Sequence, residues 1–271
     1  MNKMIFRGGL GNQMFQYALL LALRNKGHKV KCNTSLYDIT NMHNGYELDK
    51  VFGIKEDLQI NKGLSLFFLR LLCKLKPHFL YTQDNGLFNA TIINSPTLYI
   101  DGYWQDERYF KDITNTIKEI FHFKNIDERN AGIATSMKQC NSVSLHIRRG
   151  DYAAFGMLII GEEYYKKAVG EILERVDNPS FFIFSDDKKE AERIAKNLHL
   201  RFEIIDYNHG KDSYKDMFLM SQCKHNIIAN SSFSWWGAWL NDNSDKIIVA
   251  PAIWDHYHPE MHPQSKEWLL I

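Results

Sequence analysis

Closely spaced cysteine pairs and a strong net charge are both missing from this sequence of 271 residues. The four cysteines, Cys32, Cys73, Cys140 and Cys223, are scattered, which argues against a disulfide framework or a zinc site and favours reduced thiols. Lysine and arginine total 33 and aspartate and glutamate total 32, a formal net charge of +1. No bulk electrostatic field therefore favours a nucleic-acid partner, and we expect none.

The sequence also lacks an apolar run long enough to span a bilayer. Its most apolar window, Leu64 to Leu75, is about a dozen residues against the roughly 20 that a transmembrane helix needs, and it contains Arg70 and Lys74. With Phe67, Phe68 and nearby lysines, this window could make weak peripheral contact with a membrane, but a core helix is the favoured interpretation.

The first nine residues are too poor in apolar side chains to resemble a signal peptide. Together with the scattered cysteines, this start predicts a cytoplasmic protein, with the inner face of the membrane as the place of any peripheral contact.

Several catalytic signatures are absent as well. The sequence has no His-Glu-x-x-His pair, no Gly-x-Ser-x-Gly elbow and no Walker lysine. Glycines at 8, 9 and 11 follow a short apolar strand and precede a helical pattern, but Met14 stands where a dinucleotide fingerprint needs a third glycine. This loop is either a functional loop of another kind or a tight turn.

Strands and helices alternate in the second half of the chain, which predicts an α/β fold with a parallel sheet covered on both faces. A βαβ start over residues 4–32, a helical insertion over 33–96, a strand at 98–101 and a helix at 111–121 precede a polar connection at 125–139. The regular half is predicted as strands 142–147, 180–185, 202–205, 225–229 and 246–250 and helices 162–175, 187–198, 212–223 and 233–241.

Polar residues follow three of these strands. The first ends in His146, Arg148, Arg149 and Asp151, the second in Ser185, Asp186 and Asp187, and a later one in Asn230, Ser231, Ser232 and Phe233. The carboxyl ends of parallel strands meet at one edge, so we expect these groups to form an anion site from arginine side chains and a helix N-terminus. The two aspartates could instead hold a divalent metal, but the metal-free interpretation is favoured. Ser185 and the aspartates are also ordinary helix caps.

A second cluster, Tyr103, Trp104 and Gln105, follows the strand at 98–101. Aromatic and amide side chains in this place could stack on and hydrogen-bond a sugar, although aromatic residues more often belong to the core.

Together these segments resemble the α-1,2-fucosyltransferases of glycosyltransferase family 11. The resemblance rests on five segments in the family's order: residues 8–17 (GGLGNQMFQY), 102–105 (GYWQ), 146–152 (HIRRGDY), 184–187 (FSDD) and 230–236 (NSSFSWW). It implies a GT-B-like fold of two Rossmann-like domains facing a central cleft, an inverting mechanism, no metal or other cofactor, GDP-fucose as donor and a galactose-terminated glycan as acceptor.

The resemblance also implies residue roles. Arg148 matches the arginine that holds the β-phosphate and stabilises the leaving GDP, and Asn12 matches the loop asparagine that reaches the cleft. Asp216 matches the nucleotide-contacting aspartate, and His146 lies against the nucleotide. The remaining donor-binding residues are expected to be Gly11, Arg149, Ser185, Asp186, Asn230, Ser231, Ser232 and Phe233.

Inversion needs a base, for which Asp151 is the first candidate and His146 the second. Asp151 could instead pair an arginine, with the reaction proceeding by a dissociative route. The sequence divides into an N-terminal acceptor-side domain (1–140), a C-terminal donor-binding domain (141–250) and a tail (251–271) expected to pack on the N-terminal domain. Two other functions stay open, namely transfer of another GDP-sugar and non-catalytic binding of a glycan or nucleotide.

Overall fold

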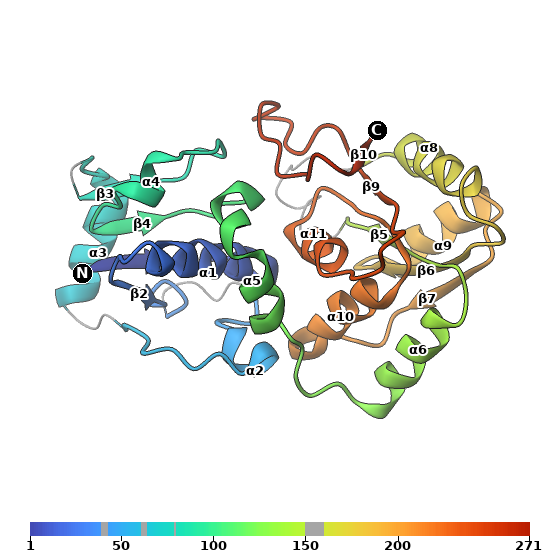
Figure 1. The fold of residues 1–271 in the computed structure, drawn as a ribbon, viewed down its shortest axis with the longest axis horizontal. Coiled ribbons are helices and arrows are strands. Elements are labelled where there is room, and N and C mark those ends of the chain that lie inside the picture. The colour runs from blue at the N-terminus through green and yellow to red at the C-terminus, as the bar shows by residue number, and fades with distance from the viewer. Residues whose placement is uncertain (39–42, 61–63, 79, 150–159) are drawn as a thin grey trace. The chain divides into compact units, whose positions relative to one another are not determined.

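The computed structural model describes residues 1–38, 43–60, 64–78, 80–149 and 160–271. The chain forms two compact units, Met1–Lys124 and Asn125–Ile271. Each unit is built around its own parallel sheet with helices packed beside it (Figure 1). The predicted α/β architecture is confirmed, because each of the two units contains a parallel sheet with helices.

The N-terminal sheet has the strand order β2-β1-β4-β3, and each neighbouring pair is parallel. Its strands are β1 (Asn2–Ile5), β2 (Val30–Asn33), β3 (Tyr81–Gln83) and β4 (Tyr99–Asp101). Its helices are α1 (Leu10–Asn25), α2 (Leu48–Phe52), α3 (Leu64–Leu75), α4 (Thr91–Asn94) and α5 (Thr114–Ile120), with 3₁₀ turns at Glu107–Tyr109 and Lys111–Ile113.

Two features of this unit differ from the sequence-based expectation. Helix α1 begins at Leu10, so Gly11 and Asn12 lie on its first turn instead of in a loop before it. The region expected to be a helical insertion contributes β3 to the edge of the sheet. A three-residue strand carries almost no periodic signal, and its pairing with β4 depends on the return of the chain to the sheet.

The C-terminal sheet has the order β10-β9-β8-β5-β6-β7, again parallel throughout. Its strands are β5 (Ser142–Ile147), β6 (Ser180–Ser185), β7 (Phe202–Ile205), β8 (His225–Ile227), β9 (Ile248–Ala250) and β10 (Leu269–Leu270). Its helices are α6 (Glu128–Lys138), α8 (Glu162–Leu173), α9 (Lys188–Asn197), α10 (Tyr214–Gln222) and α11 (Ser232–Trp239), with a 3₁₀ turn at Gly210–Asp212.

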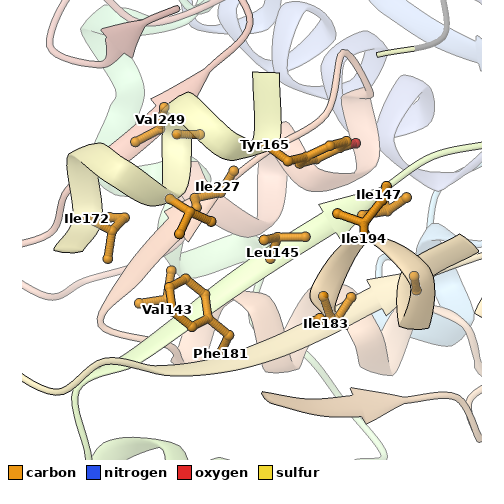
Figure 2. Packing of buried hydrophobic residues seen from close by; sticks show 14 of the residues in the cluster. Val143, Leu145, Ile147, Tyr165, Ile172, Phe181, Ile183, Ile194, Ile227 and Val249 are labelled. Atoms are coloured by element: carbon orange, nitrogen blue, oxygen red, sulfur yellow. The ribbon is translucent and has the colours of Figure 1, made fainter. Parts of the chain in front are cut away.

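Strand β5 is buried on both faces, and this burial fixes its register. Val143, Leu145 and Ile147 point into a core shared with α8 and α9 (Figure 2). Full burial of each such side chain contributes about 1.5–3 kcal/mol. A one-residue slip of the strand would move all three side chains to the opposite face of the sheet. It would also turn Arg148 to the face that α8 and α9 cover.

The unit boundary differs from the predicted division at residue 140. Helix α6 belongs to the C-terminal unit, because Ala134 and Met137 join the cluster formed by Phe182, Phe184 and α10. The polar composition of residues 125–139 suggested a connection, but one buried face is enough to attach this helix to the sheet.

The tail also differs from its expected place. Residues 251–271 belong to the C-terminal unit, where β10 pairs with β9. The Trp235 indole N–H donates to the Pro263 carbonyl at 2.7 Å, and the Gln264 amide donates to the Pro251 carbonyl at 2.6 Å. The tail therefore extends the C-terminal sheet.

All four cysteines are free, as expected for reduced thiols. In the part of the chain that the structure describes, no helix is both long enough and apolar enough to cross a bilayer.

Candidate functional site

Polar groups gather at the carboxyl edge of the C-terminal sheet. Strands β8, β5 and β6 are parallel neighbours, so the segments that follow them, 228–232, 148–149 and 186–187, leave the sheet at one edge. The prediction that these three strand ends lie on the same edge is confirmed.

Arg148 is held at this edge by Asp186. The Arg148 Nη1 atom lies 2.9 Å from Asp186 Oδ2, and the backbone N–H of Arg149 donates to Asp186 Oδ1 at 2.9 Å. About a quarter of the Arg148 side chain is exposed, 27%. Asp186 therefore orients an arginine whose guanidinium remains partly open to a ligand, and charge-assisted bonds of this kind are the strong ones.

Arg149 points to the other face of the sheet, as the strand alternation predicts. Its guanidinium forms an ion pair with Glu190 on α9, and Glu190 also binds Arg193 at 2.8 Å. Glu190 was not foreseen from the sequence. The two adjacent arginines thus have different surroundings, and donor binding by Arg149 stays a prediction.

Ser185 and Asp187 organise the turn between β6 and α9. The Asp187 backbone N–H donates to Ser185 Oγ at 3.0 Å, and the Asp187 carboxylate caps α9 by accepting the Glu190 backbone N–H at 3.1 Å. Both contacts are the ordinary capping roles of these residue types. In the described residues no group of three or more His, Cys, Asp or Glu side chains is placed to hold a metal ion.

His146 is buried beside Phe233, with 6.2 Å between the ring centroids. Burial, and then the charge of Arg148, lower the pKa of His146 well below its usual range, so the imidazole is neutral at pH 7. Its Nδ1 atom has no hydrogen-bond partner within the described residues. A neutral imidazole in this place can accept or donate a hydrogen bond, but it contributes no charge.

Helix α11 places its N-terminus at the end of β8. Ser231 caps the helix by accepting the Phe233 backbone N–H at 3.3 Å, while Ser232 is half-buried. The first turn of a helix carries backbone N–H groups without intrahelical partners, which favour an anion. Asn230 donates to the Trp254 carbonyl at 3.1 Å and so ties the tail to this strand end.

The buried side of α11 explains its fixed position. Trp235, Trp236 and Trp239 all pack inward, and the Trp235 and Trp239 rings are stacked with centroids 6.0 Å apart. Gly237 allows the neighbouring helix to approach, since a Cβ there would lie 2.8 Å from the Met220 Cβ. A helix anchored in this way holds its N-terminus in place without help from a ligand.

Asp216 belongs to a chain of polar contacts that sequence reasoning found only in part. Asn208 donates to Asp216 Oδ1 at 2.8 Å and exchanges hydrogen bonds of 2.9 and 3.1 Å with Asn130 on α6. Asn208 follows β7, the neighbour of β6. Polar residues that follow parallel strands meet at one edge of the sheet, and the same rule applied to β7 predicts Asn208 as a site residue. Asn130 has no comparable signal, because the polar composition of residues 125–139 is typical of a connection.

The surroundings of Asp216 predict a pH-dependent stability. Burial raises the pKa of Asp216 to about 7, whereas an unfolded aspartate titrates near 3.9. Its stabilising contribution is therefore fully present below pH ~4 and is lost as the pH rises through ~7. We expect Asp216→Asn to gain stability relative to the wild type between pH 5 and pH 8, measured by urea unfolding. Asp177→Asn, at an exposed position, is the control, and an Asp216→Asn difference that is the same at both pH values would contradict the prediction.

In the N-terminal unit, two buried glutamines hold the glycine loop. Gln13 donates to the Gly8 carbonyl at 3.1 Å, and Gln16 donates to the Arg7 and Gly102 carbonyls at 3.1 and 2.8 Å. Gly8 has φ +77°, and a Cβ there would lie 2.7 Å from the Asn12 amide. The glycine and glutamine positions of this motif therefore shape the backbone around Asn12.

The three side chains at 103–105 have different surroundings. Trp104 is buried and packs edge-on against Tyr109, so it belongs to the core. Gln105 donates to Asn12 Oδ1 at 2.6 Å. Tyr103 is 38% exposed. Of the two aromatic side chains considered for sugar stacking, only Tyr103 remains accessible.

A pocket of about 400 Å³ lies at the carboxyl edge of the N-terminal sheet. Its walls come from the segments that follow β1, β2 and β4, from β3 and from the end of α3. The lining residues are Arg7, Gly8, Leu36, Tyr37, Cys73, Lys76, Gln83, Asp101 and Tyr103. We call this cavity the N-terminal pocket. Its buried Asp101 is paired with Arg7 and the Tyr81 hydroxyl, so charged and hydroxyl groups meet beside an aromatic ring.

The predicted site residues are thus distributed over both units. His146, Arg148, Ser185, Asp186, Asn230, Ser231, Ser232 and Phe233 lie along the carboxyl edge of the C-terminal sheet, while Gly11 and Asn12 lie on α1 in the N-terminal unit. Asp151, the first candidate for the base, lies outside the described residues.

Comparison with known proteins identifies the family of this chain and several similar glycosyltransferases. The family model described as glycosyl transferase family 11 matches residues 1–271. Similar proteins include an alpha-1,2-colitosyltransferase of Escherichia coli (34% identical, covering 97% of this chain and 96% of that protein) and the Escherichia coli O-antigen biosynthesis glycosyltransferase WbnK (31%, 91% and 92%). Galactoside alpha-(1,2)-fucosyltransferase 1 of Bos taurus is 24% identical, covering 90% of this chain and 67% of that protein.

Among solved structures, the fucosyltransferase NodZ from Bradyrhizobium matches with a TM-score of 0.50, at 13% identity over 87% of this chain and 91% of that chain. At this identity the likeness concerns the fold alone. It confirms the GT-B-like fold expected from the sequence.

Proposed function

The chain belongs to glycosyl transferase family 11, and we propose that this glycosyltransferase transfers L-fucose from GDP-fucose to the 2-hydroxyl of a terminal galactose, with inversion and without a metal. The observation that carries the proposal is the position of the Arg148 guanidinium, which Asp186 holds. Arg148 follows β5, and β5 is the neighbour of β8, the strand that leads into α11. An oriented arginine and a helix N-terminus together suit a diphosphate.

The metal-free part of the proposal rests on how the carboxylates at this edge are used. Asp186 already accepts from the Arg148 side chain and the Arg149 backbone, and Asp187 already caps α9. Arg148 and the Ser232 N–H group at the start of α11 then supply the positive potential that a departing diphosphate needs.

The nucleotide base is assigned to the contacts around Asp216. A guanine presents a ring N–H and an amino group on one edge, and a carboxyl oxygen accepts a hydrogen bond from such a donor. Asn208 donates its hydrogen bond to Asp216 Oδ1, and the contact with the base is therefore assigned to Asp216 Oδ2. Neutral His146 and the Phe233 ring offer apolar and hydrogen-bonding surface to the same ligand.

In the proposed reaction, the galactose 2-hydroxyl oxygen forms a bond to the fucose anomeric carbon. The bond from that carbon to the diphosphate oxygen breaks, GDP departs with the electron pair, and the hydroxyl proton passes to a base. Arg148 stabilises the charge that grows on the diphosphate. Asp151 is the proposed base, because it follows Arg148 by three residues and a carboxylate suits this proton transfer.

Asp151→Asn tests the base assignment. We expect kcat to fall by about 10²- to 10⁴-fold, the usual contribution of general base catalysis, with donor affinity preserved. Initial rates across a pH series measure this, and exposed Asp177→Asn is the matched control. Turnover near that of the wild type in Asp151→Asn, alongside strongly lowered turnover in Arg148→Ala, would remove Asp151 as the base and favour the dissociative route.

For the acceptor, the proposal uses the N-terminal pocket. A galactose offers several hydroxyls and one apolar ring face, and the pocket offers the exposed Tyr103 ring together with Arg7, Gln83 and Asp101. Aromatic rings stack on such faces, while the charged and amide groups accept and donate hydrogen bonds.

A second donor is favoured by one observation, the 34% identity to an alpha-1,2-colitosyltransferase. Colitose differs from L-fucose by the absence of the 3-hydroxyl. A site that hydrogen-bonds a hydroxyl rejects a substrate lacking it by about 10⁴-fold or more, whereas an apolar site discriminates weakly. The ratio of kcat/KM for GDP-fucose and GDP-colitose therefore separates the two assignments.

The deciding experiment measures GDP release with GDP-fucose, GDP-colitose and GDP-mannose against a panel of galactosyl acceptors, with and without EDTA. Product linkage is then determined by NMR. We expect GDP-fucose to give an α-1,2-linked product in both conditions. Faster turnover with another donor would reassign the sugar, loss of turnover with EDTA would refute metal independence, and nucleotide binding without turnover would indicate a non-catalytic binding module.

A further inference from the structure

Helix α3 exposes an apolar face to solvent. Phe67, Phe68, Leu71 and Leu75 are 59%, 54%, 38% and 66% exposed. At 100° per residue these four positions fall within an arc of about 100°, so they form one stripe along the helix. We call this stripe the apolar face of α3. Contiguous exposed apolar surface of this kind marks an interaction site.

The opposite side of α3 is already packed. Leu69 is 1% exposed and lies in a cluster with Ile5 and Tyr81, against which Leu72 and Cys73 also pack. The helix lies beside β3 in the N-terminal unit (Figure 1). Its orientation on the sheet is therefore fixed, and the apolar face is directed away from the core of its own unit.

Positive charge accompanies the apolar face. Arg70 and Lys74 fall on one side of the stripe, Lys76 follows the helix, and all three are exposed. Between Asp57 and Asp84 the sequence contains no aspartate or glutamate. An apolar stripe with cations along one side matches the chemistry of an anionic lipid surface, where acyl chains lie below negatively charged headgroups.

We propose that α3 docks this protein onto anionic lipid bilayers, lying in the plane of the membrane with Phe67 and Phe68 inserted below the headgroups. The helix has 12 residues, about 18 Å at 1.5 Å per residue, against a hydrocarbon thickness of about 30 Å. It rests on the membrane surface and does not cross the bilayer.

The N-terminal pocket adjoins this surface. Cys73 and Lys76, at the end of α3, line the pocket together with Tyr103. Docking through α3 holds the pocket close to the lipid headgroups, which suits a glycan acceptor carried on a membrane lipid. This last step rests on the proposed function, whereas the docking itself does not.

Vesicle co-sedimentation of the full chain tests the proposal. We expect binding to vesicles of equal parts phosphatidylcholine and phosphatidylglycerol, much weaker binding to phosphatidylcholine alone, and weakening by salt. The Phe67→Ser/Phe68→Ser variant is expected to lose about tenfold or more in partitioning, because it lacks the two aromatic rings that insert into the membrane. Arg70→Gln/Lys74→Gln is expected to lose the preference for the anionic vesicles.

Leu173→Ser is the matched control, an equally exposed leucine on α8 (55%) for which no change is expected. GDP release with a soluble acceptor is measured for every variant, so that a failure of the proposed function is seen separately from a failure of docking. The proposal is overturned if the wild type does not bind anionic vesicles, or if Leu173→Ser loses as much binding as the phenylalanine variant. It is also overturned if Phe67→Ser/Phe68→Ser converts a dimer into a monomer on size-exclusion chromatography without changing vesicle binding, which would make the apolar face a contact between copies of the chain.

Discussion

Arg148→Ala is expected to lower kcat by about 10²- to 10³-fold, the effect of removing one pre-organised charge donor from an active site. Asp186 holds the guanidinium at 2.9 Å, and the buried register of β5 fixes the strand that carries it. The charge is therefore in place before any ligand binds. In the proposed reaction, Arg148 interacts more strongly with the departing diphosphate than with the bound donor, and this difference gives the expected effect on kcat.

Two further variants test whether the loss of kcat in Arg148→Ala comes from the guanidinium at this position. Arg148→Lys keeps the charge but loses the planar fork, so we expect a rate between those of the wild type and the alanine variant. Arg175→Ala removes an arginine from the exposed end of α8, where it pairs with Glu171, and should leave kcat unchanged. A folded Arg148→Ala protein with kcat within about threefold of the wild type would show that Arg148 does not carry the electrostatic role.

The second large effect concerns stability. Gly102→Ala is expected to destabilise the N-terminal unit by about 3 kcal/mol or more, because two independent costs add. Gly102 has φ +146°, a region that residues with a side chain rarely adopt, and a Cβ there would lie 2.0 Å from the Asp84 Cβ. Asp84 cannot retreat without loss, since it accepts the backbone N–H groups of Tyr103 and Trp104 at 3.1 and 2.7 Å.

Urea unfolding followed by circular dichroism measures this cost. Gly132→Ala is the control for the same chemical change, since its Cβ would meet nothing within 4 Å inside helix α6. That variant should be neutral or more stable by up to about 1 kcal/mol. Equal stability of Gly102→Ala and the wild type would show that the turn can rearrange, and the packing of Asp84 would then not explain this glycine.

Gly102 also illustrates what a motif leaves undetermined. The sequence marks residues 102–105 as unusual and suggests sugar binding for both aromatic residues. The structure buries Trp104, bonds Gln105 to Asn12 and leaves Tyr103 at the N-terminal pocket. Residue types alone do not distinguish these outcomes, because each depends on a packing partner outside the motif, such as Tyr109 for Trp104 or Asn12 for Gln105.

The strand ends were more predictable. Period-two alternation identified β5 and placed Arg148 and Arg149 on opposite faces, and the rule that parallel strands end at one edge brought their segments to Asp186 and Ser232. The sequence did not indicate which carboxylate pairs which arginine. Asp151 was considered as an arginine partner, whereas Asp186 and Glu190 occupy that place for Arg148 and Arg149 among the described residues.

Strand and helix periodicity are local properties of the chain. They were therefore enough to predict the α/β class, the alternating elements of the C-terminal half and the groups at its carboxyl edge. Four features depend on long-range packing and could not be predicted locally. They are the attachment of α6 and the tail to the C-terminal unit, the edge strand β3, the Asn130–Asn208–Asp216 contacts and the exposure of the apolar face of α3. Each of these depends on which distant surface a segment packs against, and that choice is set by the burial of the whole unit.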